Sequence, residues 1–350
     1  MKTKKEIIKE FDPNGPAQAG TLFGLPFSEE TAEVIVVPVP WEVTVSYRDG
    51  TANGPSAILD ASSQVDLAMR TIKNAWQLGI YMLPESDVIQ KESKNLRPVA
   101  KKYIESLDNP DSSNESVLKH INDGSKKLNQ WVFETTKSFL DKGKLVALLG
   151  GDHSTPLGFI KALAEKNSRF AILQIDAHAD LRNAYEGFSY SHASIMFNAL
   201  KLPSVSQLVQ VGIRDYCSEE LDVIDNSKGR IKTFFDEDIK ESLLKGKTWE
   251  NVCVEIVDNL PEHVYISFDI DGLDPKLCPN TGTPVAGGFD FHEIVLLLKV
   301  LAKSGKKIIG FDLNEVSPGN SDWDANVGAR ILYQLCNWMG VSQGKLEMKS

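Results

Sequence analysis

Short apolar runs recur along the whole chain and alternate with segments of helical periodicity. Eight of these runs have the length and the aliphatic or β-branched residues typical of strands, and they occupy residues 34–39, 77–83, 144–150, 170–175, 207–213, 231–235, 264–270 and 307–313. Four other segments place apolar residues on one helical face, at residues 126–143, 155–167, 291–305 and 325–340. This alternation predicts βαβ units and a mostly parallel, eight-stranded sheet with helices on both faces.

No linker or internal repeat interrupts the pattern, so we expect residues 1–350 to form one domain. Residues 1–32 precede the first predicted strand and would form an N-terminal extension. About residues 85–125 are polar, which indicates a surface insertion with one helix at 101–107.

Composition and charge narrow the class of protein. The chain is 42% hydrophobic and 25% charged, and its 38 Lys+Arg against 48 Asp+Glu give a net charge of −10. This balance argues against nucleic acid or an anionic membrane as the main partner and fits a small cationic substrate. Four scattered cysteines, an N-terminus without an apolar signal region and the absence of a run of about 20 apolar residues lead us to expect a soluble, cytoplasmic protein.

Ionisable residues follow four of the predicted strands. Ligand sites in open parallel sheets form just outside the carboxyl ends of the strands, so these positions are candidates for a shared site. The residues are His153 in GGDHS; Asp176, His178 and Asp180 in DAHADLR; Asp269 and Asp271 in SFDIDGLDP; and Glu315 in NEVSP.

The spacing of these residues points to metal binding. Side chains at positions i and i+2 of an extended chain point the same way, so Asp176, His178 and Asp180 would converge, as would Asp269 and Asp271. Each cluster alone has a structural alternative, such as a helix cap, a turn or a solvated loop. Together, four carboxylates and two imidazoles exceed one tetrahedral zinc site and would serve two cations about 3.5–4 Å apart if two carboxylates bridge. A set without thiolate favours Mn²⁺, with Ni²⁺, Co²⁺ or Fe²⁺ as further candidates.

In this order, the four motifs resemble those of the ureohydrolase (arginase–agmatinase) family over roughly residues 34–340. The resemblance implies a three-layer α/β/α arginase-like fold and two divalent metal ions per chain, Mn²⁺ first and Ni²⁺ next. By position, it implies one metal bound by His153, Asp176, Asp180 and Asp269, and a second bound by Asp176, His178, Asp269 and Asp271, with Asp176 and Asp269 bridging.

The resemblance also implies the reaction, in which a metal-bridging hydroxide hydrolyses a guanidino compound to urea and an amine. Glu315 would bind the guanidinium group through charge-assisted hydrogen bonds, and Asp180 would pass a proton to the leaving amine. His192, in YSHASIMF, matches a histidine that shuttles protons and contacts the substrate. Members of the family form homo-oligomers, usually trimers or hexamers.

Two segments bear on the substrate. Residues 45–58 and 180–196 resemble the agmatinase-type branch, and the asparagine- and serine-containing loop by which arginases hold an amino-acid head group is missing. The segment GNSDWDANVGARILYQLCNWMG resembles a bacterial subgroup that includes guanidine hydrolases, often nickel-dependent. Trp323 within it would either stack on a planar cation or serve in packing. Agmatine, free guanidine and guanidinobutyrate therefore stay open as substrates, and formiminoglutamate is less favoured.

Two other classes of protein are alternatives. A single-zinc amide hydrolase of the related deacetylase fold would bind one metal per chain and would not need both His153 and the pair Asp269 and Asp271. A regulatory subunit of a hetero-oligomer would release no urea even with both metals bound. We assign no chemistry to Arg182, which we expect to pair with nearby carboxylates.

Overall fold

All eight predicted strands are present in the computed structural model, which describes residues 2–107 and 114–349. The strands are β1 (Val34–Val39), β2 (Ile80–Met82), β3 (Leu145–Gly150), β4 (Phe170–Ile175), β5 (Val205–Ile213), β6 (Ile231–Phe235), β7 (His263–Asp269) and β8 (Lys307–Asn314). They form one sheet in the order β2-β1-β3-β8-β7-β4-β5-β6. Every neighbouring pair is parallel, so the predicted mostly parallel sheet is confirmed.

The helices connect these strands and extend beyond the four predicted segments. They are α1 (Lys4–Glu10), α2 (Gly54–Ser62), α3 (Asp87–Ser106), α4 (Glu115–Asp141), α5 (Leu157–Lys166), α6 (Ile195–Ala199), α7 (Ser218–Asp225), α8 (Asp236–Leu244), α9 (Trp249–Asp258), α10 (Phe291–Lys303) and α11 (Trp323–Ser342). The four predicted helices correspond to α4, α5, α10 and α11, and α4 begins earlier than its sequence pattern indicated. Among the described helices, none is long and apolar enough to cross a membrane.

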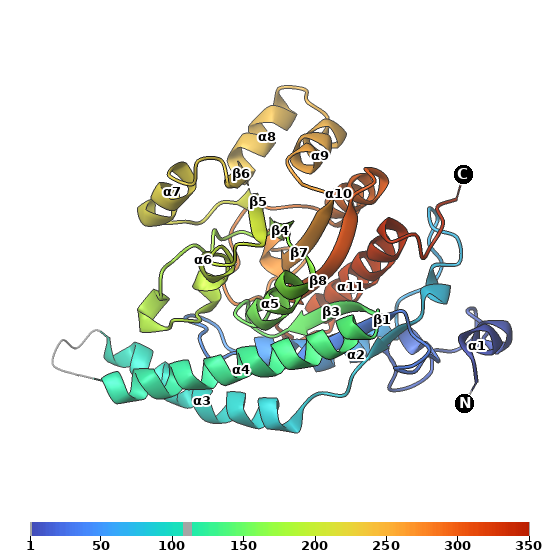
Figure 1. The fold of residues 1–350 in the computed structure, drawn as a ribbon, viewed down its shortest axis with the longest axis horizontal. Coiled ribbons are helices and arrows are strands. Elements are labelled where there is room, and N and C mark those ends of the chain that lie inside the picture. Colours follow the sequence, from blue (N-terminus) through green and yellow to red (C-terminus); the bar gives the residue numbers. More distant parts are fainter. Residues whose placement is uncertain (1, 108–113, 350) are drawn as a thin grey trace.

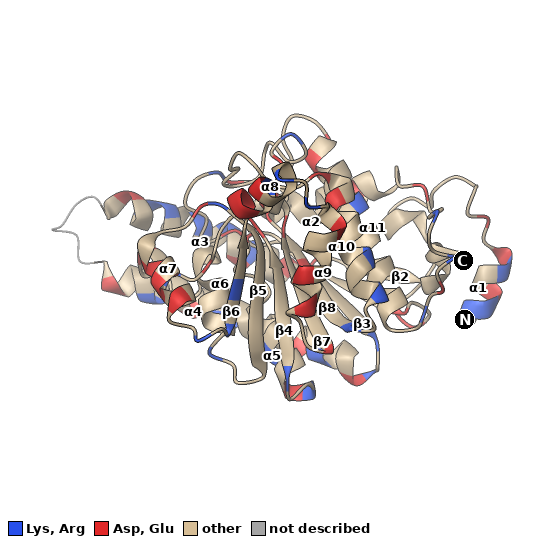
Figure 2. Cartoon of the chain, turned by 90° about the horizontal axis from the view of Figure 1, so that it is seen from above, with Lys and Arg blue, Asp and Glu red and all other residues tan. Residues whose placement is uncertain are grey.

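The sheet lies between two groups of helices (Figures 1 and 2). One group is α3, α4, α5 and α6, in which each helix packs on the next. In the other group, α9 packs on α10, α10 on α11 and α11 on α2. Strands covered on both faces are nearly continuous apolar runs, and all six residues of β1 and of β4 are buried. Charged residues gather on the helices and loops, and the strands carry few of them (Figure 2).

Two segments fold more extensively than the sequence pattern indicated. Residues 85–125 contain the 20-residue helix α3 and the start of α4, where we expected one short helix; residues 108–113 lie outside the described part of the chain. Helix α3 buries Ile89, Leu96 and Tyr103 on one face, so this segment is part of the helical layer as well as polar surface. In the N-terminal extension, the Phe23 ring packs edge-on against Tyr333 of α11, with centroids 4.9 Å apart. The assignment of residues 1–350 to one domain stays a prediction.

Strand order determines where the candidate site forms. The four strands that end in ionisable residues are β3, β8, β7 and β4, and these are consecutive neighbours in the middle of the sheet. Because parallel strands end at the same edge, the polar residues that follow them meet above the centre of the sheet.

Candidate metal centre and substrate pocket

The loop after β3 holds His153 through backbone contacts that its sequence makes feasible. Gly151 passes so close to Trp41 that a Cβ atom would lie 2.0 Å from the Trp41 carbonyl oxygen. The buried Asp152 carboxylate accepts a hydrogen bond from the Ser154 backbone N–H (3.0 Å) and so closes the turn. These contacts place the His153 ring at the carboxyl ends of the strands.

Nε2 of His153, the ring nitrogen that faces away from the carboxylates, is held by Ser267 and Asp312 of the sheet. Nε2 lies 2.8 Å from Ser267 Oγ on β7, and Ser267 in turn donates to Asp312 Oδ1 on β8 (3.0 Å). A histidine that binds a metal commonly has its second nitrogen held in this way. The arrangement aims Nδ1 at the carboxylates above the sheet.

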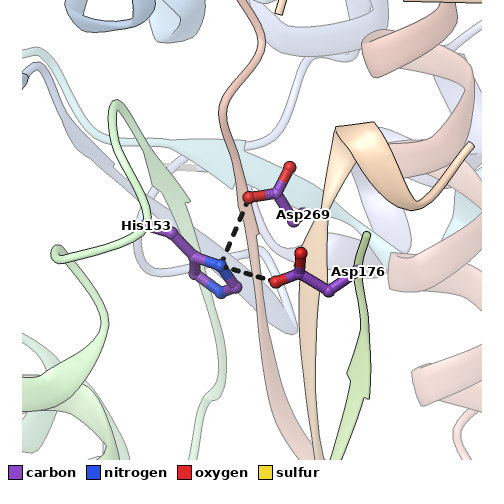
Figure 3. Close-up of side chains that lie close together, drawn as sticks. All are labelled: His153, Asp176 and Asp269. Carbon is purple, nitrogen blue, oxygen red and sulfur yellow. Dashed lines mark ion pairs between the residues drawn. The ribbon is translucent and has the colours of Figure 1, made fainter. Parts of the chain in front are cut away.

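Nδ1 of His153 lies among three carboxylates and makes no hydrogen bond within the described part of the chain. It lies 3.1 Å from Asp176 Oδ2, 3.1 Å from Asp180 Oδ2 and 3.3 Å from Asp269 Oδ2. Figure 3 shows the His153 ring pointing toward Asp176 and Asp269, which come from neighbouring strands. One ring nitrogen surrounded by three carboxylate oxygens is an arrangement suited to a shared cation.

A second group forms around His178, on the solvent side of the first. Its Nδ1 lies 3.0 Å from Asp271 Oδ2 and 3.6 Å from Asp176 Oδ1. Asp176 therefore turns one oxygen toward His153 and the other toward His178. The ligand atoms of His153, Asp176 and Asp269, and those of Asp176, His178 and Asp271, form two sets in which all atoms lie within 4.8 Å of one another.

The electrostatics of the cluster fit bound cations. Burial lowers the pKa of the His153 imidazole, but the carboxylates around it outweigh that effect and raise the pKa well above its usual value. Burial, together with the charges of Asp271 and Asp176, raises the pKa of Asp269 well above its usual range. So many buried carboxylates need compensating positive charge, and divalent cations held by these oxygen and imidazole donors would supply it.

Two of the predicted site residues have an unusual backbone. Asp180 (φ 55°) and Glu315 (φ 64°) both adopt the left-handed conformation that non-glycine residues rarely take. Such positions cost of order 1–3 kcal/mol and gather at functional sites. At Glu315 the surrounding contacts hold the conformation, since its backbone N–H donates to the Gly151 carbonyl (2.8 Å) and its carbonyl accepts from Thr281 Oγ1 (2.9 Å).

A pocket of about 160 Å³ opens directly above the cluster. It is lined by Ser46, His153, His178, Asp180, Arg182, Tyr185, His192, Ala193, Asp215, Tyr216, Glu220, Asp269, Thr283 and Glu315. The two imidazole groups, Glu315 and His192 thus face one cavity. Burial, followed by repulsion from His178, lowers the pKa of His192 to about 4, so its ring is neutral near pH 7 and able to accept a proton.

Trp323 lies away from the pocket, whereas Arg182 makes the carboxylate contact expected of it, with Glu220. Trp323 is not among the residues that line the pocket; it is 46% exposed at the start of α11, and its indole N–H donates to the Lys276 carbonyl (3.0 Å). Trp323 therefore does not face this pocket, and its stacking on the substrate stays a prediction. Arg182, to which we assigned no chemistry, does line the pocket, where its guanidinium lies over the Tyr185 ring (4.8 Å) and its Nε lies 3.6 Å from Glu220 Oε2.

Other residues near the site were missed in the sequence, although signals for them existed. Asp215 comes just after β5, the same position relative to a strand that identified the other clusters. Its Oδ2 lies 3.7 Å from His178 Nε2 at the pocket rim. Gln174 and Gln210 are polar residues inside otherwise apolar strands, and both are fully buried below the site.

The sequence of this chain is similar to those of known proteins. A family model described as the arginase family matches residues 32–337. The chain is 29% identical over 318 residues to an N(1)-aminopropylagmatine ureohydrolase of Synechocystis sp., covering 90% of this chain and 91% of that protein. It is 30% identical over 319 residues to an agmatinase of Neisseria meningitidis, covering 90% of each.

Solved structures support the fold. The agmatine ureohydrolase of Thermoplasma volcanium superposes with a TM-score of 0.70 at 23% identity, covering 97% of this chain and 99% of that one. The predicted three-layer α/β/α arginase-like fold is thereby confirmed.

Proposed function

This chain belongs to the arginase family, whose members are dinuclear metal hydrolases, and we propose that it hydrolyses a guanidino compound, agmatine or a close relative, to urea and an amine. The observation that carries the proposal is the position of Asp176. Its two oxygens face two separate imidazole groups, directly beneath a pocket that Glu315 and His192 line.

The residues at the site fit two divalent cations. His153, Asp176, Asp180 and Asp269 would hold one cation, and Asp176, His178, Asp269 and Asp271 would hold the other. Oxygen and imidazole donors favour Mn²⁺ first and Ni²⁺ next. When bound, such a pair lowers the pKa of a water molecule and so supplies a nucleophile near neutral pH.

Glu315 would orient the planar guanidinium group. Its Oε1 already accepts a hydrogen bond from the His153 backbone N–H (2.8 Å), which fixes the carboxylate and leaves Oε2 for the substrate. A charge-assisted hydrogen bond from the guanidinium to this buried oxygen would hold the electrophilic carbon over the cluster.

Proton transfer would fall to Asp180 and His192. Asp180 Oδ2 lies 3.1 Å from His153 Nδ1 and Asp180 lines the pocket, so its carboxylate is placed to accept a proton from the attacking water and to return it to the leaving amine. Neutral His192 on the pocket wall would carry protons between this site and solvent.

Free guanidine is a second candidate substrate, and the size of the pocket favours it. At about 160 Å³ the cavity is of a size for a small ligand, and free guanidine is the smallest of the candidate substrates. The Arg182 cation on its wall would also repel the distal ammonium group of agmatine. Both substrates yield urea, and they differ in the amine that leaves, which is ammonia for guanidine.

A urea-release assay tests the proposal. The protein is loaded with Mn²⁺ or Ni²⁺ and incubated with agmatine, guanidine, guanidinobutyrate or arginine. We expect urea from agmatine or guanidine and two metal ions per chain. No urea from any of them with two metals bound would favour a regulatory subunit, and one metal per chain would favour the single-zinc alternative.

We further propose a cytoplasmic location and a homo-oligomer, a trimer or hexamer. Light scattering coupled to size-exclusion chromatography measures the oligomeric state directly.

A further inference from the structure

Three of the four candidate ligand carboxylates are each held by a backbone amide. Asp269 Oδ1 accepts from the Asp271 N–H (2.8 Å), Asp271 Oδ1 from the Ala177 N–H (3.0 Å) and Asp176 Oδ1 from the His178 N–H (2.7 Å). These bonds follow from the course of the main chain through the loops. In all three residues, the second oxygen points toward an imidazole.

Asp176 differs because its second oxygen is held as well, by a side chain. Gln174 Nε2, two residues back on β4, donates to Asp176 Oδ2 (2.9 Å) and to the His178 carbonyl (3.1 Å). A carboxylate and a carbonyl only accept hydrogen bonds, so the Gln174 side chain must present its NH₂ group on this side.

A second amide fixes Gln174 from behind. Gln210 on β5 donates through Nε2 to Gln174 Oε1 (2.7 Å) and to the Ala179 carbonyl (2.8 Å), and its own Oε1 accepts from Thr233 Oγ1 on β6 (2.8 Å). The three side chains thus form a row across β6, β5 and β4 in which every donor points toward Asp176. Gln174 and Gln210 are fully buried, where unpaired amides would cost free energy.

The hydrogen-bonded row of Thr233, Gln210 and Gln174 determines which lone pairs of Asp176 remain available to bind a metal. A carboxylate has about four acceptor positions. The His178 N–H takes one on Oδ1 and Gln174 takes one on Oδ2, which leaves one on each oxygen, facing the two imidazole groups. With both outer positions filled, the carboxylate has one orientation, and that orientation is the bridging one.

We propose that Gln174, aligned by Gln210 and Thr233, is a positioning residue that holds Asp176 in its bridging orientation and thereby sets the affinity for the metal pair. This inference rests on the metal assignment of the proposed function. It gives a role to polar residues buried in the sheet that neither contact the substrate pocket nor bind a metal.

Titration of Mn²⁺ alone into chelator-treated protein tests the inference without reference to activity. Gln174→Met keeps the length of the side chain and removes its amide, and losses of outer hydrogen bonds of this kind typically cost about 10- to 100-fold in metal affinity. We expect at least one of the two Mn²⁺ affinities to fall by about that factor. The matched control is Gln207→Met, which makes the same change three residues from Gln210, on the opposite face of β5, and should leave both affinities unchanged.

The kinetics separate positioning from a general loss of structure. In Gln174→Met, excess Mn²⁺ should restore kcat, and KM for the guanidino substrate should stay as in the wild type. If this variant does not fold, Gln210→Met keeps the Gln174 amide beside Asp176 but removes its aligning bond from Gln210, together with the Gln210 bonds to Ala179 and Thr233, and should weaken Mn²⁺ binding several-fold. Mn²⁺ affinities within threefold of wild type in the folded variants would overturn the inference.

Failure of the inference and failure of the proposed function give different results. A wild-type chain that binds two Mn²⁺ ions but releases no urea contradicts the function and leaves the titration valid. A wild-type chain that releases urea while Gln174→Met binds Mn²⁺ unchanged contradicts only the inference.

Discussion

Replacing Glu315 with glutamine is the sharpest test of the proposed substrate contact. Glu315 is 6% exposed, and its Oε1 accepts the His153 backbone N–H at 2.8 Å. Glutamine is nearly isosteric, and its oxygen would keep this bond. The NH₂ group of the glutamine would then occupy the position of Oε2 and face the guanidinium N–H groups of the substrate. Both are hydrogen-bond donors, so no hydrogen bond could form between them.

The size of the effect follows from the bond that is lost. A hydrogen bond to a charged group contributes about 1.5–3 kcal/mol, and about 1.4 kcal/mol corresponds to a tenfold change. Glu315→Gln should therefore lower kcat/KM roughly 10- to 150-fold, and the facing donors place the expected value in the upper part of that range. Initial rates of urea release over a range of substrate concentrations measure it.

The fold should tolerate this substitution. Burial, and then the charge of Asp152, raise the pKa of Glu315 well above its usual value. A carboxyl group whose pKa is higher in the folded than in the unfolded state destabilises the fold as pH rises above the unfolded value. Chelator-treated Glu315→Gln should therefore melt no lower than chelator-treated wild type at pH 8. Full metal content with kcat/KM within threefold of wild type would refute a role for Glu315 in binding the guanidinium.

Four further outcomes are expected. Asp176→Asn should weaken the binding of both metal ions, because this carboxylate faces both imidazoles. Asp271→Asn should leave the binding of the ion at His153 unchanged. If elemental analysis finds two metal ions in Asp176→Asn, Asp176 does not bridge them. Arg182→Ala removes a positive charge and a large side chain from the pocket wall, so it should raise the ratio of kcat/KM for agmatine to kcat/KM for guanidine by about tenfold, or about 1.4 kcal/mol. An unchanged ratio would show that Arg182 does not select the substrate. Chelation should lower the melting temperature, and Mn²⁺ at about 100 times its Kd should restore about 2.7 kcal/mol per site; equal melting curves with and without metal would argue against a folded-state metal site. Phe311→Ala, in the fully buried centre of β8, should cost about 3–5 kcal/mol in a denaturant titration, and a loss below about 1 kcal/mol would indicate a core that refills the space.

The strands could be predicted from the sequence because each is a short apolar run that is buried on both faces. Helix α3 was largely missed for two reasons. Most of its residues are polar, and only a narrow face that includes Leu96 and Ala100 is buried. Pro98 also lies within it, and proline usually ends or kinks a helix. Its full length became visible only with α4 packed against it.

The sequence by itself determined the candidate ligands. In an extended chain, side chains two residues apart point to the same side, so the short motifs DAHAD and DID were enough to predict metal ligands. That locality also explains why family membership could be inferred from four short motifs.

The family resemblance implied which ligands share a metal, and only the tertiary structure decided how the sheet brings them together. Strands β3, β8, β7 and β4 are far apart in sequence but adjacent in the sheet, and this adjacency places both oxygens of Asp176 between two imidazoles. The same long-range pairing aligns Gln174 with Gln210, brings Arg182 to the pocket wall and leaves Trp323 outside it. Strand order and loop packing depend on contacts between segments that are distant in the sequence, and such contacts cannot be predicted from a local pattern of residues.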